Sequence, residues 1–355
     1  MPTRRDLLSA ALALPLSAGL KPARAQPGAA FAALQADLSE VPRALFRRTQ
    51  DDTPALIHWG DTGAAALAAP GGRWRRLSRP FGAEQMGPGL EGRWAERVSF
   101  GPGDILRYVV IEAAPEAGAI LELGPGKGKD VARALSQTGY TQAVRKDISV
   151  WWRGETDLAI DLAARNPADP FGGLVGKSAR IAIRGDRLYY AAAWPMLEAL
   201  TGGGGEPVGH PDLAEALAAL PVAGGALAVQ ALLLNAQGDL SAAPPGTGLP
   251  PWRIGLIIDL FDQGQDLIAA VFSFDTAPMA AQAAERMRRI WDEFPLSDGR
   301  SFGATLGPAA TGASDQGVPV AWLIAPSQPA EAGGNRGWEL ILRLMATRQL
   351  VPFGL

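Results

Sequence analysis

The chain has 355 residues, a formal net charge of −3, 2 histidines and no cysteine. This length is enough for one large or two medium domains, each with its own hydrophobic core. The charge lacks the basic excess that binding to a phosphate backbone requires, so we expect no nucleic-acid partner. Without cysteine, and with so few histidines, thiol chemistry is excluded and we predict neither a metal site nor a cofactor.

Residues 1–25 have the features of an export signal. The segment Thr3-Arg4-Arg5-Asp6-Leu7-Leu8 resembles the twin-arginine signature, and an apolar run and the small-residue sequence Ala23-Arg24-Ala25 follow it. The resemblance implies export of an already folded protein and cleavage after Ala25. An uncleaved anchor is the alternative, but the apolar run is short for a bilayer span and contains Pro15. We therefore expect a periplasmic protein without a stable membrane span.

The sequence pattern of residues 26–205 predicts mainly short strands joined by turns, with helices between some of them. Residues 55–61 read as a buried strand, and β-branched residues 106–112 lead through a turn at 115–118 into a second strand at 119–123. A helical pattern follows. The further elements that we expect are a helix at 130–138, strands at 148–152, 179–183 and 188–192, and a helix at 195–200.

The region 206–355 repeats this order at a common sequence offset. Residues 231–239 read as a buried strand that ends in a turn, and further strands are expected at 254–260 and 267–274, with turn residues at 262–266 between them. A helix begins at Pro278, which suits a first helical turn. The remaining predicted elements are strands at 301–306 and 318–325 and a helix at 338–347.

These patterns predict an α+β fold made of two related halves. Each half would be a mainly antiparallel sheet with helices packed on one side, a ferredoxin-like type of layering. The boundary falls in residues 201–211, where a run of glycines and prolines interrupts regular structure. The alternative is coincidence, because a strand, a hairpin and a helix in succession are common in unrelated folds.

A glycine-rich segment follows the predicted strand 119–123. With the preceding Ile120-Leu-Glu-Leu it resembles the first motif of S-adenosylmethionine-dependent methyltransferases, whose glycines let the backbone approach the cofactor. That motif opens a parallel unit, whereas the hairpin expected here implies antiparallel strands. We interpret the segment as a loop and keep an anion site, or a carrier site for an organic cofactor, as the alternative. The candidate residues are Gly124, Gly126, Lys127, Gly128 and Lys129.

Residues 71–99 form an insertion rich in arginine and tryptophan that has no counterpart in the second half. Long loops inside compact domains are usually functional or disordered. Arginine and tryptophan together are typical of protein interfaces and of sites that bind anionic ligands. A surface loop whose aromatic residues pack locally is the alternative. The partner-binding candidates are Arg73, Trp74, Arg75, Arg76, Arg79 and Trp94.

The remaining candidates for chemistry are carboxylates and His58. Asp157 and Asp161 would share one face if residues 157–165 were helical, and His58 lies near Asp61. No nucleophile motif of the Gly-x-Ser-x-Gly form accompanies them. We therefore predict no catalytic residue and favour an exported binding or accessory protein, whose partner is a protein or a small molecule. The alternatives are a periplasmic enzyme, such as a hydrolase, that uses carboxylates or His58, and a cofactor carrier at Gly124–Gly128.

Overall fold

The computed structural model describes residues 29–47, 55–78, 80–82, 91–202, 209–234, 248–330, 333–347 and 349. The predicted export signal and the C-terminal residues 350–355 lie outside them. The strands, in chain order, are β1 (Leu56–Asp61), β2 (Ile105–Ala113), β3 (Glu116–Leu123), β4 (Thr141–Arg145), β5 (Ile148–Arg153), β6 (Ala179–Arg184), β7 (Arg187–Ala191), β8 (Leu227–Leu234), β9 (Ile254–Asp262), β10 (Gln265–Ser273), β11 (Ala310–Ser314) and β12 (Val320–Pro326).

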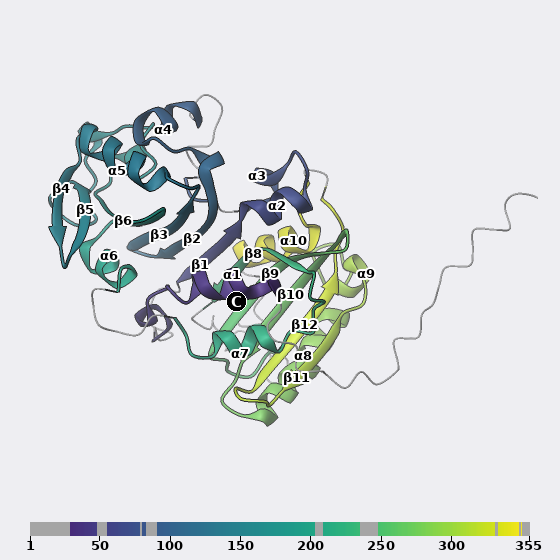
Figure 1. Ribbon diagram of the computed structural model, residues 1–355. Helices are drawn as coiled ribbons and strands as arrows, with labels where there is room; N and C mark the ends of the chain where they lie inside the picture. Colours follow the sequence, from purple (N-terminus) through teal and green to yellow (C-terminus); the bar gives the residue numbers. More distant parts are fainter. Residues whose placement is uncertain are drawn as a thin grey trace, which may run out of the picture.

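All of these strands belong to one 12-stranded sheet, in the order β11-β12-β10-β9-β8-β1-β2-β3-β7-β6-β5-β4. Every adjacent pair is antiparallel. The pairing of β1 with β8 joins the N-terminal and C-terminal strands into this single sheet (Figure 1). Read outward from that pair, the order is β1-β2-β3-β7-β6-β5-β4 in one direction and β8-β9-β10-β12-β11 in the other.

The helices cover both faces of the sheet (Figure 1). In the described residues, no helix combines the length and the apolar composition that a bilayer crossing needs. The helices are α1 (Ala29–Leu38), α2 (Thr62–Ala68), α3 (Arg73–Arg76), α4 (Glu91–Val98), α5 (Lys127–Gln137), α6 (Trp194–Leu200), α7 (Leu213–Ala218), α8 (Ala277–Glu293), α9 (Phe302–Leu306) and α10 (Arg336–Ala346).

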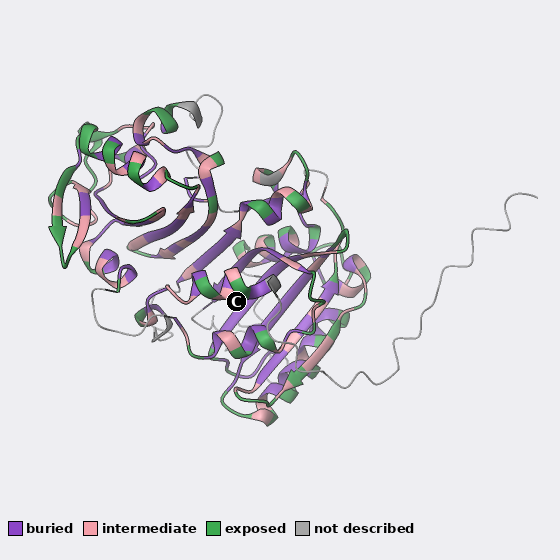
Figure 2. Cartoon of the chain, in the orientation of Figure 1, coloured by how far each residue is buried: buried purple, intermediate pink, exposed green. Residues whose placement is uncertain are grey.

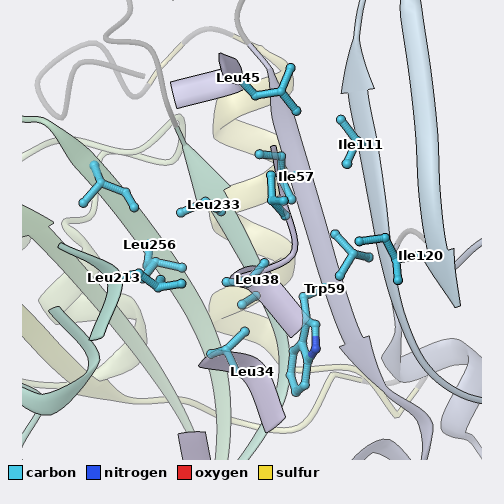
Figure 3. Close-up of a cluster of buried hydrophobic side chains, with 14 of the residues drawn as sticks. Leu34, Leu38, Leu45, Ile57, Trp59, Ile111, Ile120, Leu213, Leu233 and Leu256 are labelled. Carbon is cyan, nitrogen blue, oxygen red and sulfur yellow. The ribbon is translucent and has the colours of Figure 1, made fainter. Parts of the chain in front are cut away.

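One apolar core lies between the sheet and helices α1, α6 and α7. Leu34 and Leu38 of α1 pack with Ile57 and Trp59 of β1, and Leu213 of α7 belongs to the same cluster (Figure 3). On the opposite face, α2, α4 and α5 cover the N-terminal strands while α8, α9 and α10 cover the C-terminal strands. The expected α+β class is therefore confirmed. The expected layering, with two separate sheets that each carry helices on one side only, is not confirmed.

The physical reason is visible in the central strands. β9 is buried at seven consecutive positions from Ile254 to Leu260, and β8 at seven from Ala228 to Leu234 (Figure 2). A half-exposed antiparallel strand buries alternate residues, whereas a strand that is buried at every position needs cover on both faces. The layering therefore follows from the central strands, whose burial on both faces requires helices on both sides.

The predicted strands, hairpins and helices agree with the structure at most positions, with one clear correction. Residues 301–306, expected as a strand, contain helix α9, because the Ser301 hydroxyl accepts a hydrogen bond from the Ala304 amide and caps the helix. The edge strand that follows is β11, which the sequence did not predict. Helices α1 and α7 were also not predicted, although each directly precedes a central strand in its half of the sheet.

Candidate functional site

The glycine-rich loop joins antiparallel strands to a helix, as the hairpin predicts. β2 and β3 pair antiparallel, with Val109 opposite Ile120, and α5 begins at Lys127 after β3 ends. A parallel unit, which the resemblance to methyltransferases implies, is therefore absent at this position. Lys127 is bound to Asp104 at 3.0 Å, and Lys129 is exposed.

The amide groups of this loop are already bound to an anion, which is a side chain of the protein. Gly126 N and Gly128 N each donate a hydrogen bond of 2.9 Å to the carboxylate of Asp186, in the turn between β6 and β7. The hydrogen bonds from Gly128 and then Gly126 lower the pKa of Asp186 below its ordinary value, because they stabilise the ionised form. These glycines therefore bind the neighbouring β6–β7 hairpin. The anion at their amide groups is the carboxylate of Asp186, a residue of the same chain.

Gly128 is required by a close approach of two backbone segments. A Cβ atom at this position would lie 1.9 Å from the carbonyl oxygen of Gly185. Gly126 has a φ of +82°, a left-handed conformation that glycine adopts without strain. The glycine pattern therefore encodes tight packing between the start of α5 and the β6–β7 turn.

The inserted segment 71–99 contributes a buried ion pair. Arg76, on α3, donates from Nε to Asp259 at 2.9 Å and from Nη2 at 2.6 Å. The same guanidinium lies 2.9 Å from a carboxylate oxygen of Asp266. Burial lowers the pKa of Arg76, but the attraction of the two carboxylates outweighs it and the net shift is upward. Arg76 is therefore an internal charged residue that fixes the insertion to β9 and β10.

Two amides complete the surroundings of Asp259. Gln230 Nε2 donates to one carboxylate oxygen at 2.9 Å, and Asn335 Nδ2 donates to the other at 2.7 Å. Burial nevertheless raises the pKa of Asp259 to about 6, because it penalises the ionised form more than these partners favour it. Asn335 also caps α10, so the cluster connects β8, β9, α3 and α10.

The other residues of the insertion divide between the interior and the surface. Trp94 is fully buried, with its ring 5.4 Å from that of Phe100. Trp74 is half-buried and Arg75 is exposed. Arg79 and the side chain of Arg73 lie outside the described residues. Burial of Arg76 and Trp94 removes them from any surface that a partner can contact in this conformation.

His58 and its neighbour Asp61 occupy structural positions. His58 is 5% exposed within β1, between Val110 of β2 and Leu232 of β8. Asp61 accepts a hydrogen bond of 2.9 Å from Ala64 N and thereby caps α2. The two residues therefore have separate roles, one inside the sheet and one at a helix end.

Residues 157–165 do not form a continuous helix, so Asp157 and Asp161 do not share a helix face. Asp157 lies in a loop, where it pairs with Arg180 at 3.0 Å and accepts a hydrogen bond from Trp194 N. Asp161 caps a short 3-10 helix, Leu162–Ala164, by accepting from Ala163 N. Short polar side chains that bind nearby amides favour such turns over a continuous helix. In the described residues, no group of three or more histidine, aspartate or glutamate side chains has the geometry of a metal site.

A groove of about 340 Å³ lies near the turn of the β2–β3 hairpin. Strands β2, β3 and β7 contribute one side of it, and residues 170–177 and 80–82 contribute the other. Glu112 and Lys177 are its charged residues. Its apolar lining includes Phe81, Val110, Ala117, Leu174, Val175 and Tyr190.

The loop that borders this groove is ordered by its own backbone. Asp161 N donates to Gly176 O at 3.0 Å, and Asn166 N donates to Gly173 O at 2.8 Å. A Cβ atom at Gly176 would lie 1.9 Å from the Asp161 carbonyl oxygen, so the two segments touch there. The loop nevertheless exposes large apolar side chains: Ile160 is 61% exposed, Leu162 70% and Val175 40%.

The groove could not be predicted from the sequence. Its residues come from distant segments, and none of them belongs to a motif with a recognised chemistry. The signal that was present is the cluster of glycines at 172–176, two of which have a left-handed φ, within a segment that also carries several apolar residues. Ordered loops of this kind are frequent at binding sites.

No protein-family model matches the chain, and no curated protein matches it. Among solved structures, "Structure of crystal form III of TP0453" is similar with a TM-score of 0.34 and 8% sequence identity, covering 80% of this chain and 92% of that chain. "Structure of crystal form I of TP0453" is similar with a TM-score of 0.33 and 8% identity, covering 80% and 90%.

Proposed function

We propose that this protein is an exported periplasmic binding protein without catalytic activity of its own, and that its ligand site is the groove beside the β2–β3 hairpin. The groove is the observation that carries the proposal. Ligand sites are concave, mainly apolar, and contain a small number of polar groups that orient the ligand. The groove has this composition, with aromatic walls at Phe81 and Tyr190 and charged groups at Glu112 and Lys177.

The rigidity of its borders supports this role. The groove residues Phe81 and Tyr190 have ring centroids 6.0 Å apart, and both rings also contact Phe171. On the other side, the backbone bonds of the loop 157–178 hold Leu174 and Val175 in place. A site that is ordered before binding loses less conformational entropy when the ligand enters, which favours affinity.

A neutral apolar dye provides the test. N-phenyl-1-naphthylamine should bind the mature protein saturably, with one site per chain and a rise in fluorescence. Ala117→Leu, which places a larger side chain on the groove side of β3, should abolish that signal. Ala310→Leu is the matched control, because Ala310 is exposed on the edge strand β11. Equal dye binding by the two variants would contradict the proposal.

A duplication origin for the two halves, 26–205 and 206–355, belongs to the same proposal. In each half a helix precedes the central strand, α1 before β1 and α7 before β8, and both helices pack in the same core. Each central strand then leads to an antiparallel hairpin followed by a helix, α5 or α8. Superposition of β8-β9-β10-α8 on β1-β2-β3-α5 with the same connectivity would test it, and opposite placement of the two helices would contradict it.

A further inference from the structure

Lys177 places a positive charge at one end of the groove. Its backbone is fixed, because its amide donates to Gly172 O at 2.9 Å and its carbonyl oxygen accepts from Arg153 Nη2 at 3.0 Å. The guanidinium of Arg153 is itself neutralised by an ion pair with Asp169. Among the described residues, no carboxylate forms an ion pair with Lys177, and the residue as a whole is half-buried. A partly desolvated ammonium gains most from an anionic partner.

The other charged residue of the groove is distant from this end. Glu112 lies on β2, whereas Lys177 immediately precedes Ser178 and the start of β6. Strands β3 and β7 lie between β2 and β6 in the sheet. Neighbouring strands are about 4.8 Å apart, so along the sheet the backbones of β2 and β6 are separated by at most about 14 Å. Because Glu112 is negative and Lys177 is positive, we place the anionic group of a ligand at Lys177.

The surroundings of Lys177 are apolar. Ile160 forms a β-bridge with Lys177, and Val175 lies two residues before it. Both are exposed large apolar side chains, and Val175 also lines the groove. A ligand with an acidic group at Lys177 would thus place its remaining atoms against apolar surface on either side, where their burial is favourable.

We infer that the groove binds a small organic acid with an apolar body, whose carboxylate pairs with Lys177. This inference rests on the proposed function and adds the chemical class of the ligand. The volume of about 340 Å³ suits a small molecule rather than a protein segment, since small-molecule sites usually occupy about 300–1,000 Å³. The charge at Lys177 selects an acid over a neutral or basic molecule with the same body.

Three probes with one apolar chain and different head groups test this class: decanoate, 1-decanol and decylamine. Isothermal titration at pH 7 on the mature protein should show that decanoate binds most tightly, by about tenfold over decanol, a factor typical of one charge-assisted contact. Lys177→Met should reduce decanoate to the affinity of decanol and leave decanol unchanged. Lys177→Arg should retain the preference for decanoate, and Lys146→Met is the control for loss of an exposed lysine elsewhere on the surface.

The outcomes separate the two proposals. Equal affinity for the three probes, or a preference for decanoate that persists in Lys177→Met, would overturn the ligand class while dye binding in the groove still stands. Failure of all three probes to bind would also overturn the ligand class, and the dye titration with Ala117→Leu then decides independently whether the groove binds ligands. Thermal denaturation of each variant verifies that a loss of binding is not a loss of folding.

Discussion

The guanidinium of Arg76 and the carboxylate of Asp259 form a two-point hydrogen-bonded ion pair between residues that are 183 positions apart in the chain. Both side chains are almost completely buried, at 1% and 0% exposure. The pair attaches the inserted segment of the N-terminal region to the C-terminal strands. Part of what the sequence suggests as a partner surface is therefore an internal connection between the two regions of the sheet.

Removal of Arg76 should strongly destabilise the protein. Arg76→Met leaves the carboxylates of Asp259 and Asp266 buried without their cation, which typically costs about 3–5 kcal/mol. Arg75→Met is the matched control, because Arg75 is the exposed neighbour on the same helix and should change stability by less than about 0.5 kcal/mol. Urea denaturation of both variants at pH 7 measures this difference. Equal stability of the two variants would show that the ion pair makes no net contribution.

The stability of the wild-type protein should depend on the ionisation of Asp259. Burial raises the pKa of this carboxyl from 3.8 to about 6, so the folded state holds a proton that the unfolded state has lost between these values. The stabilisation of the folded state by this bound proton is complete below pH 4. It decreases as the pH rises above 4 and is lost once the pH exceeds about 6. Relative to Asp259→Asn, the free energy of unfolding of the wild type should fall by about 3 kcal/mol over this interval. Parallel profiles from pH 4 to 7 would contradict the assignment.

Replacement of Gly128 should loosen the contact between α5 and the β6–β7 turn. An alanine Cβ would lie 1.9 Å from Gly185 O, so one backbone segment must move, at a cost of about 1–3 kcal/mol. Hydrogen exchange at the amides of Gly126 and Gly128 should accelerate in Gly128→Ala, because both bonds to Asp186 depend on this approach. Gln137→Ala, at an exposed position near the other end of the same helix, should leave both exchange rates unchanged.

Export should depend on the arginine pair near the N-terminus. The twin-arginine signature is read as an address, so lysine at both Arg4 and Arg5 should retain the full-length precursor in the cytoplasm. Cell fractionation and immunoblotting in the native host measure the ratio of precursor to mature protein. A single conservative substitution at Asp6 to Glu serves as the control. Normal appearance of the mature form in the periplasm with both lysines would contradict the export prediction.

Several elements could be predicted because local sequence determines them. Strands β2 and β3, with the turn between them, follow from β-branched runs interrupted at Pro115, although β3 begins at Glu116 and so includes part of the segment 115–118 that was expected as a turn. Helix α8 follows from Pro278 near its start and an amphipathic pattern after it. The antiparallel direction of the strands beside the glycine-rich loop could also be inferred, since a short turn permits no other direction.

The site could not be predicted because it depends on contacts between distant segments. The sequence places Arg76 in a loop that resembles a binding surface, and only its pairing with Asp259 and Asp266 shows that it is internal. Similarly, the glycines at 126 and 128 suggest an anion site, and only the fold places Asp186 at their amides. Which carboxylate reaches which cation is decided by strand order.

The amino-acid sequence by itself determined the α+β class, the main hairpins and the absence of thiol chemistry, because these depend on composition and on the periodicity of neighbouring residues. The tertiary structure alone decided that the strands join in one sheet, through the pairing of β1 with β8. It also decided that Phe81, Lys177 and Tyr190 meet around one groove. Contacts between residues so far apart in the chain depend on how distant segments pack, and local periodicity carries no information about which segments become neighbours.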